Sequence, residues 1–404
     1  MSFFTPASDL AQSKKPLPLV AQCGACGLWR QCKSPKMPVD GQGKKKILIC
    51  GESPGRSEDE QGKPFLGSAG RVLWSTLRRF GVERDDCWTT NSARCFPPGG
   101  KYPKDTVTHC RPFLVQAVKE LKPEVIILLG DKAVQSLIGW LWKEDNGNLA
   151  RWEGQQIPVQ SINCWVCPTY HPASSFYDDS GDKGNEVKRL FFERRLEAAC
   201  QLQGRPWATV PDYRKQVEVV YDVDAAAAIL DEFTEAGGKI AFDYETTCLK
   251  PDGPHAEIYC CSVCWEGKRT IAYPWHGAVV AATERLLRSP VRKLGQNVQF
   301  EQRWTKAKLG FWVKNWALDG MLGAHVLDSK SGATGLKFQA FTEFGVDAYD
   351  EKVAPYLRSK TNGGNEPNRI REAPLGEVLL YCGLDSLFEY MIDVKQAAKL
   401  GVGL

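Results

Sequence analysis

The sequence lacks the segments that would carry it into or across a membrane. It contains no uninterrupted apolar run of about 20 residues, so it predicts no transmembrane helix. Its opening, MSFFTPASDLAQSKKPLPLV, has neither a basic n-region nor an apolar h-region, so we expect no signal peptide. The chain also shows no internal repeat. These absences predict a cytoplasmic protein without a membrane partner.

Cysteine, in contrast, is abundant. The chain has 15 cysteines, a number that would suggest disulfide bonds in a small secreted protein. In a long chain without a signal peptide we expect a reducing environment. Some of the thiols are then better explained as ligands of a metal or a cluster than as disulfide partners.

Length and composition predict two globular domains. The 404 residues exceed one ordinary core and suit two domains of roughly 200 residues each. Residues 1–205 hold 29 Lys and Arg against 22 Asp and Glu, whereas the remainder holds 23 against 26. The basic excess of the first half suits phosphate binding, and the acidic second half suits cation binding.

The first half alternates short apolar strands with helical patterns, which predicts a parallel sheet with crossover helices. We expect a tail at 1–20, a first domain at 21–203, a Gly- and Pro-containing linker at 204–215 and a second domain at 216–404. The expected strands of the first domain are 46–50, 88–93 and 125–129, and its expected helices are 71–80, 113–121 and 185–202.

The second half has a different rhythm. It predicts a helix at 223–236, strands at 239–245 and 259–265, and mainly helices from residue 300 onward, ending in a long one at 375–400. The stretch 359–368 is rich in Gly, Asn and Pro, and we expect it to form a loop.

An acidic motif stands at the end of the strand expected at 239–245. Asp243 and Glu245 are separated by one residue, so both side chains point to the same face of the sheet. Two like charges placed together require cations. Asp-x-Glu taken alone is also common on surface strands, so the motif needs support from elsewhere in the chain.

Two later segments give that support. The sequence NVQFE (297–301) puts Glu301 after an aromatic residue at a strand-to-helix junction. In YCGLD (381–385), Tyr381 and Asp385 lie four residues apart, on one face of the expected helix. These motifs, in this order, resemble the tyrosine subgroup of the DEDD-type 3′ to 5′ exonucleases, as do LDGML (318–322) and GLK (335–337) between them.

The resemblance covers residues 216–400 and implies a ribonuclease H-like fold. It implies that Asp243, Glu245, Glu301 and Asp385 hold two Mg²⁺ or Mn²⁺ ions, and that Tyr381 orients the attacking water. Hard divalent cations prefer such oxygen ligands. The family usually has Asp where this chain has Glu301, so the carboxylate stands on a longer arm here.

The first half carries a second set of motifs. The turn GESPG (51–55) follows an apolar strand, and GKPFLGSAG (62–70) opens a helix, an arrangement that exposes backbone N–H groups to a ligand. Together with TNSARC (90–95) and YHPA (170–173), these segments resemble the family-four uracil-DNA glycosylases over residues 20–200. The resemblance implies that family's parallel-sheet α/β fold.

That family holds a 4Fe–4S cluster with four cysteines, and the resemblance places them at Cys23, Cys26, Cys95 and Cys110. A lone Cys-x-x-Cys could equally hold zinc. The remaining candidates are expected to be core cysteines: Cys32, Cys164, Cys167, Cys260, Cys261 and Cys264.

The same resemblance assigns a uracil pocket. Asn91 would read the edge of a flipped uracil, and Phe65 would stack on the base. His171 would donate a hydrogen bond to the developing uracil anion. Glu52 would organise the attacking water, because no Asp follows it in this chain.

Several positions depart from the family pattern. Ser53 stands where Ala or Gly is usual, and an acidic pair at 178–179 replaces the usual wedge and arginine, with Phe176 as a substitute wedge. No His occurs at 97–104, which argues against the covalent-capture variant of the superfamily. The acidic pair leaves open a single-stranded substrate or a loss of activity.

The leading hypothesis is a bifunctional DNA enzyme, with DNA as partner through single strands or 3′ ends. The alternative is an exonuclease whose first half only binds DNA or a partner. The arrangement resembles the N-terminal region of certain bacteriophage family A DNA polymerases, so we expect a bacterial, phage-encoded protein. No palm or fingers segment follows Leu404, which predicts either a separate factor that works with a polymerase or a truncated polymerase.

Overall fold

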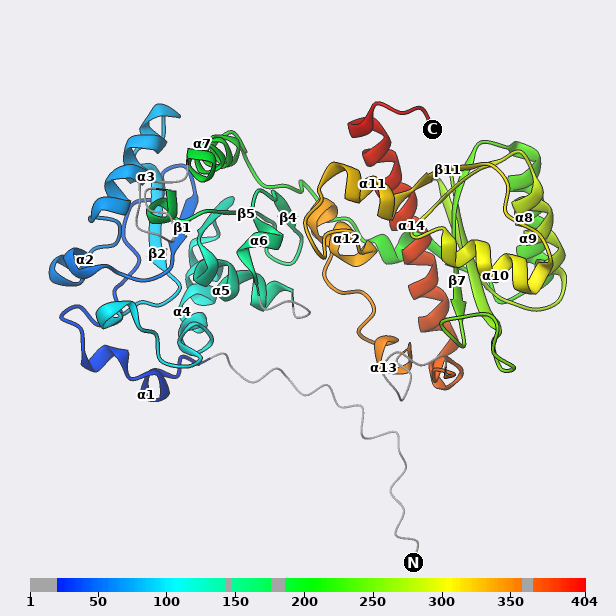
Figure 1. The fold of residues 1–404 in the computed structure, drawn as a ribbon, viewed down its shortest axis with the longest axis horizontal. Helices are drawn as coiled ribbons and strands as arrows, with labels where there is room; N and C mark the ends of the chain where they lie inside the picture. The colour runs from blue at the N-terminus through cyan, green and yellow to red at the C-terminus, as the bar shows by residue number, and fades with distance from the viewer. Residues whose placement is uncertain (1–19, 143–146, 176–185, 358–365) are drawn as a thin grey trace, which may run out of the picture. The chain divides into compact units, whose positions relative to one another are not determined.

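The computed structural model describes residues 20–142, 147–175, 186–357 and 366–404 (Figure 1). Phe176, the acidic pair at 178–179 and most of the expected loop at 359–368 lie outside these ranges. The chain divides into two compact units. Unit 1 comprises Met1–Pro123, Ile127–Gly147 and Thr169–Cys200, and unit 2 comprises Glu124–Ile126, Asn148–Pro168 and Gln201–Leu404.

The first sheet has five strands in the order β2-β1-β3-β5-β4. Every residue of β1 and β3 is buried, as expected for apolar strands that are covered on both faces. Strands β1 and β2 pair in parallel, as the sequence predicts, whereas β4 pairs antiparallel with β5 at the edge. The strands are β1 (Ile47–Gly51), β2 (Cys87–Asn91), β3 (Val125–Leu129), β4 (Ile157–Val159) and β5 (Cys164–Thr169).

Helices connect these strands. Helix α3 is amphipathic: it buries Leu73, Trp74 and Leu77 and ends in two arginines. The helices of the first half are α1 (Cys23–Cys26), α2 (Arg56–Gln61), α3 (Ser68–Arg79), α4 (Thr106–Leu121), α5 (Asp131–Leu141), α6 (Leu149–Trp152) and α7 (Glu186–Cys200).

The second sheet has six strands in the order β11-β10-β7-β8-β9-β6. Strands β7, β8 and β9 form an antiparallel meander, and β10 and β11 lie parallel to β7 on its other side. This is the strand order of a ribonuclease H-like sheet, with β6 added beside β9, and it confirms the predicted fold. The strands are β6 (Val217–Val219), β7 (Lys239–Thr246), β8 (Ile258–Trp265), β9 (Arg269–Pro274), β10 (Arg292–Gly295) and β11 (Trp316–Asp319).

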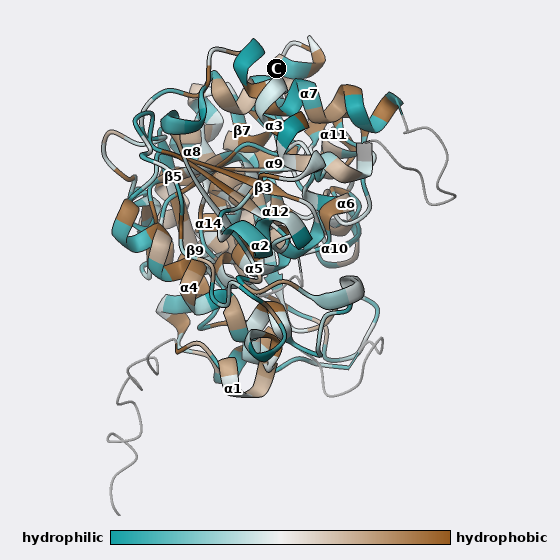
Figure 2. Ribbon diagram, turned by 90° about the vertical axis from the view of Figure 1, so that its left-hand side faces the viewer, coloured by the Kyte–Doolittle hydropathy of each residue, from teal (hydrophilic) through white to brown (hydrophobic). Residues whose placement is uncertain are grey.

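Helices cover both faces of this sheet. Helices α8 and α9 share one core with Phe242 and Tyr244, whereas α14 packs against the face that carries Ala241. In Figure 2 the strand ribbons are mainly brown, which marks their apolar character. The helices are α8 (Val223–Ala236), α9 (Ala278–Arg288), α10 (Gln299–Leu309), α11 (Gly320–Leu327), α12 (Leu336–Phe344), α13 (Ala354–Leu357) and α14 (Leu375–Leu400).

Helix α14 is fixed against the sheet at its middle. Ser262 Oγ of β8 donates a hydrogen bond to the Cys382 carbonyl at 2.7 Å. A side chain at Gly383 would lie 2.3 Å from Val217 Cγ1, so only glycine permits this close approach.

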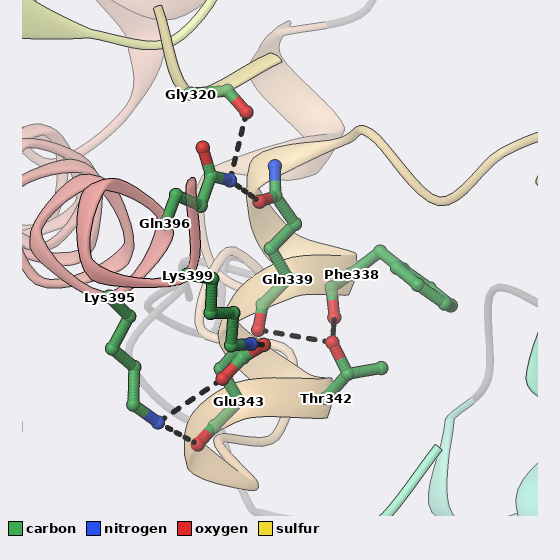
Figure 3. A network of polar contacts seen from close by, with 8 residues as sticks. All are labelled: Gly320, Phe338, Gln339, Thr342, Glu343, Lys395, Gln396 and Lys399. Carbon is green, nitrogen blue, oxygen red and sulfur yellow. Dashed lines mark hydrogen bonds and ion pairs between the residues drawn. The ribbon is translucent and has the colours of Figure 1, made fainter. Parts of the chain in front are cut away.

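The C-terminal part of α14 is fixed to α11 and α12 (Figure 3). Gln396 Nε2 donates to the Gly320 carbonyl at 3.0 Å and to Gln339 Oε1 at 2.6 Å. Lys395 and Lys399 both pair with Glu343, at 3.2 and 2.5 Å. Any side chain that α14 presents to the sheet is therefore held in place along the helix.

Within the described ranges, no helix combines the length and apolarity that crossing a bilayer requires.

Candidate active sites

The first candidate site lies where the strands of the first sheet end. Gly51 and Asn91 are register partners at the carboxyl ends of β1 and β2. The N–H of Gly130, directly after β3, donates to the carbonyl of Thr169 at the end of β5. Side chains that follow these strands therefore gather at one edge, where ligands bind in open α/β sheets.

Phe65 enters this site from the loop before α3 in a strained conformation. Its φ of 57° lies in the left-handed region, which aromatic residues rarely adopt. The Trp74 indole N–H donates to the Phe65 carbonyl at 3.1 Å, and a side chain at Gly70 would lie 2.1 Å from the same oxygen. The surrounding structure thus imposes the strain, a pattern typical of functional sites.

Gly51 forms the floor between the Phe65 ring and the Asn91 amide. A Cβ atom at position 51 would lie 2.5 Å from Asn91 Oδ1 and 2.7 Å from Phe65 Cζ. Both side chains are otherwise buried, with Phe65 4% and Asn91 5% exposed. The structure therefore brings together an aromatic ring and an amide, the two groups that recognition of a flipped base requires.

Glu52 follows Gly51 and reaches the start of α5. Its Oε1 accepts a hydrogen bond from the Lys132 N–H at 3.3 Å and would lie 2.5 Å from a Cβ atom on Gly130. Burial raises the pKa of this carboxyl, although the Lys132 N–H opposes the shift. A carboxylate with a raised pKa is a better base toward water than an exposed one.

His171 follows β5 and is a neutral donor. Its Nδ1 accepts the Ala173 N–H at 3.2 Å, so Nε2 carries the proton of the neutral ring. Desolvation lowers the pKa of His171 to about 4. The imidazole is therefore uncharged near neutral pH and offers an N–H at Nε2.

A further pair that the sequence did not reveal lies beside Glu52. Ser53 Oγ and the Tyr102 hydroxyl are hydrogen-bonded at 2.7 Å. Burial raises the pKa of Tyr102, and the charge of Glu52 adds to the shift. Ser53, which departs from the family pattern, thus ties the strand-end turn to the segment before α4.

The four cysteines assigned to a cluster line one pocket, together with Arg94. Backbone N–H groups point at two of the sulfurs: Lys36 N lies 3.2 Å from Cys95 Sγ and Arg94 N lies 3.4 Å from Cys110 Sγ. Burial raises the pKa of Cys95 to about 12 and that of Cys110 to about 11. Thiols of this kind ionise when they bind a metal, and N–H···S bonds are typical of cluster ligands.

The six cysteines expected to lie in the core divide into two groups. Cys164 and Cys167 of β5 and the three cysteines of β8 are buried, as expected for core residues. Cys32 differs from that expectation, because it is partly exposed and its thiol contacts Cys95.

The second candidate site lies on the face of the second sheet that packs against α14. Asp243 and Glu245 share this face because side chains alternate along β7. Their carboxylate oxygens and Cys382 Sγ all lie within 4.8 Å of one another. Cys382 comes from α14, next to Tyr381, and no motif spacing singles it out.

Glu301 and Asp385 complete the acidic set around this group. Desolvation is the main cause of the raised pKa values of Asp243 and Glu301. The charge of Asp385 raises the pKa of Asp243 further, and the charge of Asp243 raises that of Glu301. Glu301 lies in the first turn of α10 and is 2% exposed. Its position depends on Asp319, whose carboxylate accepts the N–H groups of Asn297 and Val298 at 3.0 and 3.1 Å.

Two tyrosines meet Asp385. The Tyr349 hydroxyl donates to Asp385 Oδ1, and Tyr381 also lowers the pKa of this carboxyl by hydrogen bonding, although burial raises it overall. Lys337 Nζ lies 5.0 Å from the centre of the Tyr381 ring and 2.9 Å from Asp350 Oδ2. Tyr349 follows α12 in a loop, where no sequence spacing marks it.

Glu389 adds a fifth carboxylate to the group, and it is buried. It follows Asp385 by four residues on α14 and is 3% exposed. Burial raises its pKa, and the charges of Asp243, Glu301 and Asp385 raise it further. Among the described residues, Glu301 Oε2 and Glu389 Oε2 have no hydrogen-bond partner. Buried carboxylates in this state fit divalent cations, which supply the missing positive charge.

The first half of the chain matches a known superfamily. The family model "Uracil DNA glycosylase superfamily" matches residues 38–194. A type-4 uracil-DNA glycosylase of Pyrobaculum aerophilum is 38% identical over 160 residues, which cover 39% of this chain and 80% of that protein. The enzyme of the same description from Archaeoglobus fulgidus is 33% identical, covering 48% of this chain and 94% of that protein. The chain belongs to the uracil-DNA glycosylase superfamily, and its matched relatives are type-4 enzymes.

Solved structures overlap with the chain more distantly. RNase D of Escherichia coli, described as an exoribonuclease, has a TM-score of 0.34 and 14% identity and covers 46% of this chain, which spans 45% of that protein. The Nibbler EXO domain of Aedes aegypti has a TM-score of 0.34 and 15% identity, covering 46% of this chain and 91% of that chain. The fold of the second unit is therefore identified from the strand order of its sheet, and its site from the carboxylates on that sheet.

Divalent cations are expected to stabilise the second site. A cation at 100 times its dissociation constant would add about 2.7 kcal/mol to the free energy of unfolding. Thermal unfolding of the full chain with Mg²⁺ or Mn²⁺ and with EDTA measures this gain. Asp243→Asn should lose most of it, whereas Asp231→Asn, which changes an exposed carboxylate of α8, should keep it. Equal gains in both variants would contradict a cation site at Asp243.

Proposed function

We propose that this chain is a bifunctional DNA enzyme. Its first half excises uracil from DNA by hydrolysis of the N-glycosidic bond, and its second half removes nucleotides from 3′ ends by phosphodiester hydrolysis. The observation that carries the first activity is the placement of Phe65 and Asn91 around Gly51 at the carboxyl ends of β1 and β2, with Glu52 and His171 on the segments that follow β1 and β5. The acidic face of β7 beside α14 carries the second.

In the first activity, Asn91 hydrogen-bonds the edge of a flipped uracil while the Phe65 ring stacks on the base. Glu52 accepts a proton from a water molecule, whose oxygen forms the new bond to the sugar carbon. The glycosidic bond breaks, and its electron pair leaves with uracil. His171 Nε2–H donates to the resulting anion and stabilises the charge without becoming an imidazolium first.

The four thiols of Cys23, Cys26, Cys95 and Cys110 fit a 4Fe–4S cluster, because they line one pocket and backbone N–H groups point at two of the sulfurs. Such a cluster would contribute structural cross-linking between α1, α4 and the segment after β2. Arg94 opposes the negative charge of the thiolates, since its guanidinium interacts with three of them.

In the second activity, Asp243, Glu245, Glu301 and Asp385 would hold the cations. Two bound Mg²⁺ or Mn²⁺ ions would neutralise the scissile phosphate and activate a water. Tyr381 orients that water, and Tyr349 and Lys337 hold Asp385 and Tyr381 in position.

The proposed organisation follows from these sites. The glycosylase domain spans residues 21–203 after a tail at 1–20, and the exonuclease domain spans 216–404 after the linker. The partner is DNA, single-stranded or at 3′ ends and containing uracil, and a DNA polymerase is the second proposed partner. Both activities suit a replication or repair factor encoded by a bacteriophage.

Uracil release tests the first activity. Single-stranded and duplex oligonucleotides with one uracil should yield abasic product, detected by alkaline cleavage. His171→Ala and Asn91→Ala should each slow release by about 100-fold or more, because one preorganised donor is worth that much in related sites. Gln116→Ala on the exposed face of α4 should not.

The pH profile of the same assay separates catalysis from folding. Glu52 acts as a carboxylate, so the rate should fall as the pH falls through its raised pKa, before the pH reaches about 4, where His171 becomes protonated. Glu52→Gln should remove this dependence along with most of the rate. Absence of abasic product with the wild type would support the exonuclease-only alternative instead.

The cluster proposal predicts a brown protein with a broad visible absorption band and iron in the purified chain. Cys95→Ser should lose the band and the iron, because one of four ligands is missing. Cys167→Ser, at a buried thiol of β5, should keep both. A colourless protein that contains zinc would contradict the proposal.

The exonuclease proposal predicts Mg²⁺-dependent shortening of a 5′-labelled strand from its 3′ end. Asp243→Ala should slow shortening by about 100-fold or more, as expected when a cation worth several kcal/mol is lost. Asp231→Ala should not change the rate. DNA and RNA strands are compared in parallel, together with a strand whose 3′ end is blocked. Unchanged shortening by Asp243→Ala would show that the activity does not come from this site.

A further inference from the structure

Cys382 places a thiol inside the acidic group of the second site. Its Sγ lies 3.8 Å from Asp243 Oδ2, and all three ligand atoms of Asp243, Glu245 and Cys382 lie within 4.8 Å of one another. The residue is fully buried, and Ser262 holds its backbone through the bond to its carbonyl. Its sulfur contacts the Ser262 hydroxyl at 3.3 Å as well as the Asp243 carboxylate.

The spacing fits a tetrahedral cation. A zinc ion binds sulfur at about 2.3 Å and carboxylate oxygen at about 2.1 Å, which puts two such ligands about 3.6 Å apart at tetrahedral angles. The 3.8 Å between Cys382 Sγ and Asp243 Oδ2 is close to that separation. Glu245 supplies a third ligand atom within 4.8 Å of both.

A second observation also points to a bound cation. Glu301 Oε2 and Glu389 Oε2 are buried and have no hydrogen-bond partner among the described residues, and both carboxylates interact electrostatically with Asp243. Lys337 is the basic residue that acts on Asp243 and Glu245, but its Nζ is paired with Asp350. The group therefore remains short of positive charge.

Cation type determines which ligands are used. Mg²⁺ and Mn²⁺ prefer oxygen and leave a thiol protonated, whereas Zn²⁺ and Cd²⁺ favour thiolate. With hard cations, Cys382 remains a weak donor to Asp243. A thiophilic cation binds the Cys382 sulfur together with Asp243 and Glu245, so these two carboxylates no longer bind the hard cations.

We propose that Asp243, Glu245 and Cys382 form an alternative site for a thiophilic divalent cation, Zn²⁺ in particular, which competes with the hard cations of the second site. On binding, the Cys382 S–H bond breaks, sulfur bonds the cation and one proton leaves to solvent. Zn²⁺ then inhibits the proposed exonuclease. The binding claim stands without that activity, and only the inhibition rests on the proposed function.

Cadmium binding tests the site directly. The full chain is titrated with Cd²⁺ in the absence of Mg²⁺, and the ultraviolet thiolate-to-cadmium charge-transfer band is recorded. The four thiols assigned to the cluster can also bind Cd²⁺ when they are free, so the band is read as a difference: the wild type should gain more absorbance than Cys382→Ser. Cys264→Ser is the matched control, since Cys264 is an equally buried thiol of β8 that packs in the core near Leu294. It should retain the wild-type band.

A second variant serves as a control for misfolding. Asp243→Asn keeps the thiol but removes one ligand, so it should weaken Cd²⁺ binding by at least about tenfold while circular dichroism stays unchanged. An identical band in Cys382→Ser and the wild type, or a Cys382-dependent band that Asp243→Asn leaves at full affinity, would overturn the proposed site.

Inhibition is measured separately. Strand shortening in Mg²⁺ is titrated with Zn²⁺, and each variant is normalised to its own rate without Zn²⁺. The inhibitory concentration should rise at least about tenfold in Cys382→Ser and stay the same in Cys264→Ser. If no strand is shortened, the exonuclease proposal fails and the Cd²⁺ band still decides the site. If shortening occurs without a Cys382-dependent band, only this inference fails.

Discussion

Repulsion among closely placed carboxylates constrains the second site. Asp243, Glu245, Glu301, Asp385 and Glu389 meet between β7, α10 and α14, and desolvation is the main cause of the raised pKa of each. Protein groups offset this only in part. The close packing of α14 and its polar contacts with α11 and α12 hold the carboxylates together against their mutual repulsion, so the fold maintains an arrangement that is complete only with cations.

The first unit has a different requirement, because its histidine must stay neutral. His171 is kept uncharged by burial, and its tautomer is set by a backbone N–H. Glu52 is the carboxylate of this site and lies at a helix start, where the backbone favours an anion. Burial therefore serves the two proposed chemistries differently. In the second unit it leaves carboxylates that need cations, and in the first it keeps His171 neutral, so that the ring can stabilise a leaving anion.

Sequence predicted most of the framework for physical reasons. The strand 125–129 and the helices 223–236 and 375–400 match β3, α8 and α14, because their apolar patterns are long and regular. Spacing also placed Asp243 with Glu245 and Tyr381 with Asp385. Tyr349 could not be found, because its contact depends on a loop. Glu389 could have been, since it repeats the four-residue spacing after Asp385, whereas Cys382 required the helix to be docked on β7.

Gly70 shows how a position remote from chemistry becomes as restricted as a reactive one. Its hydrogen faces the Phe65 carbonyl where any larger group would collide, so the aromatic ring keeps its strained pose only while position 70 stays minimal. Across a set of related sequences this position would vary as little as Asn91. An alignment would then suggest ligand contact at Gly70, although its role is to shape the backbone that presents a neighbour.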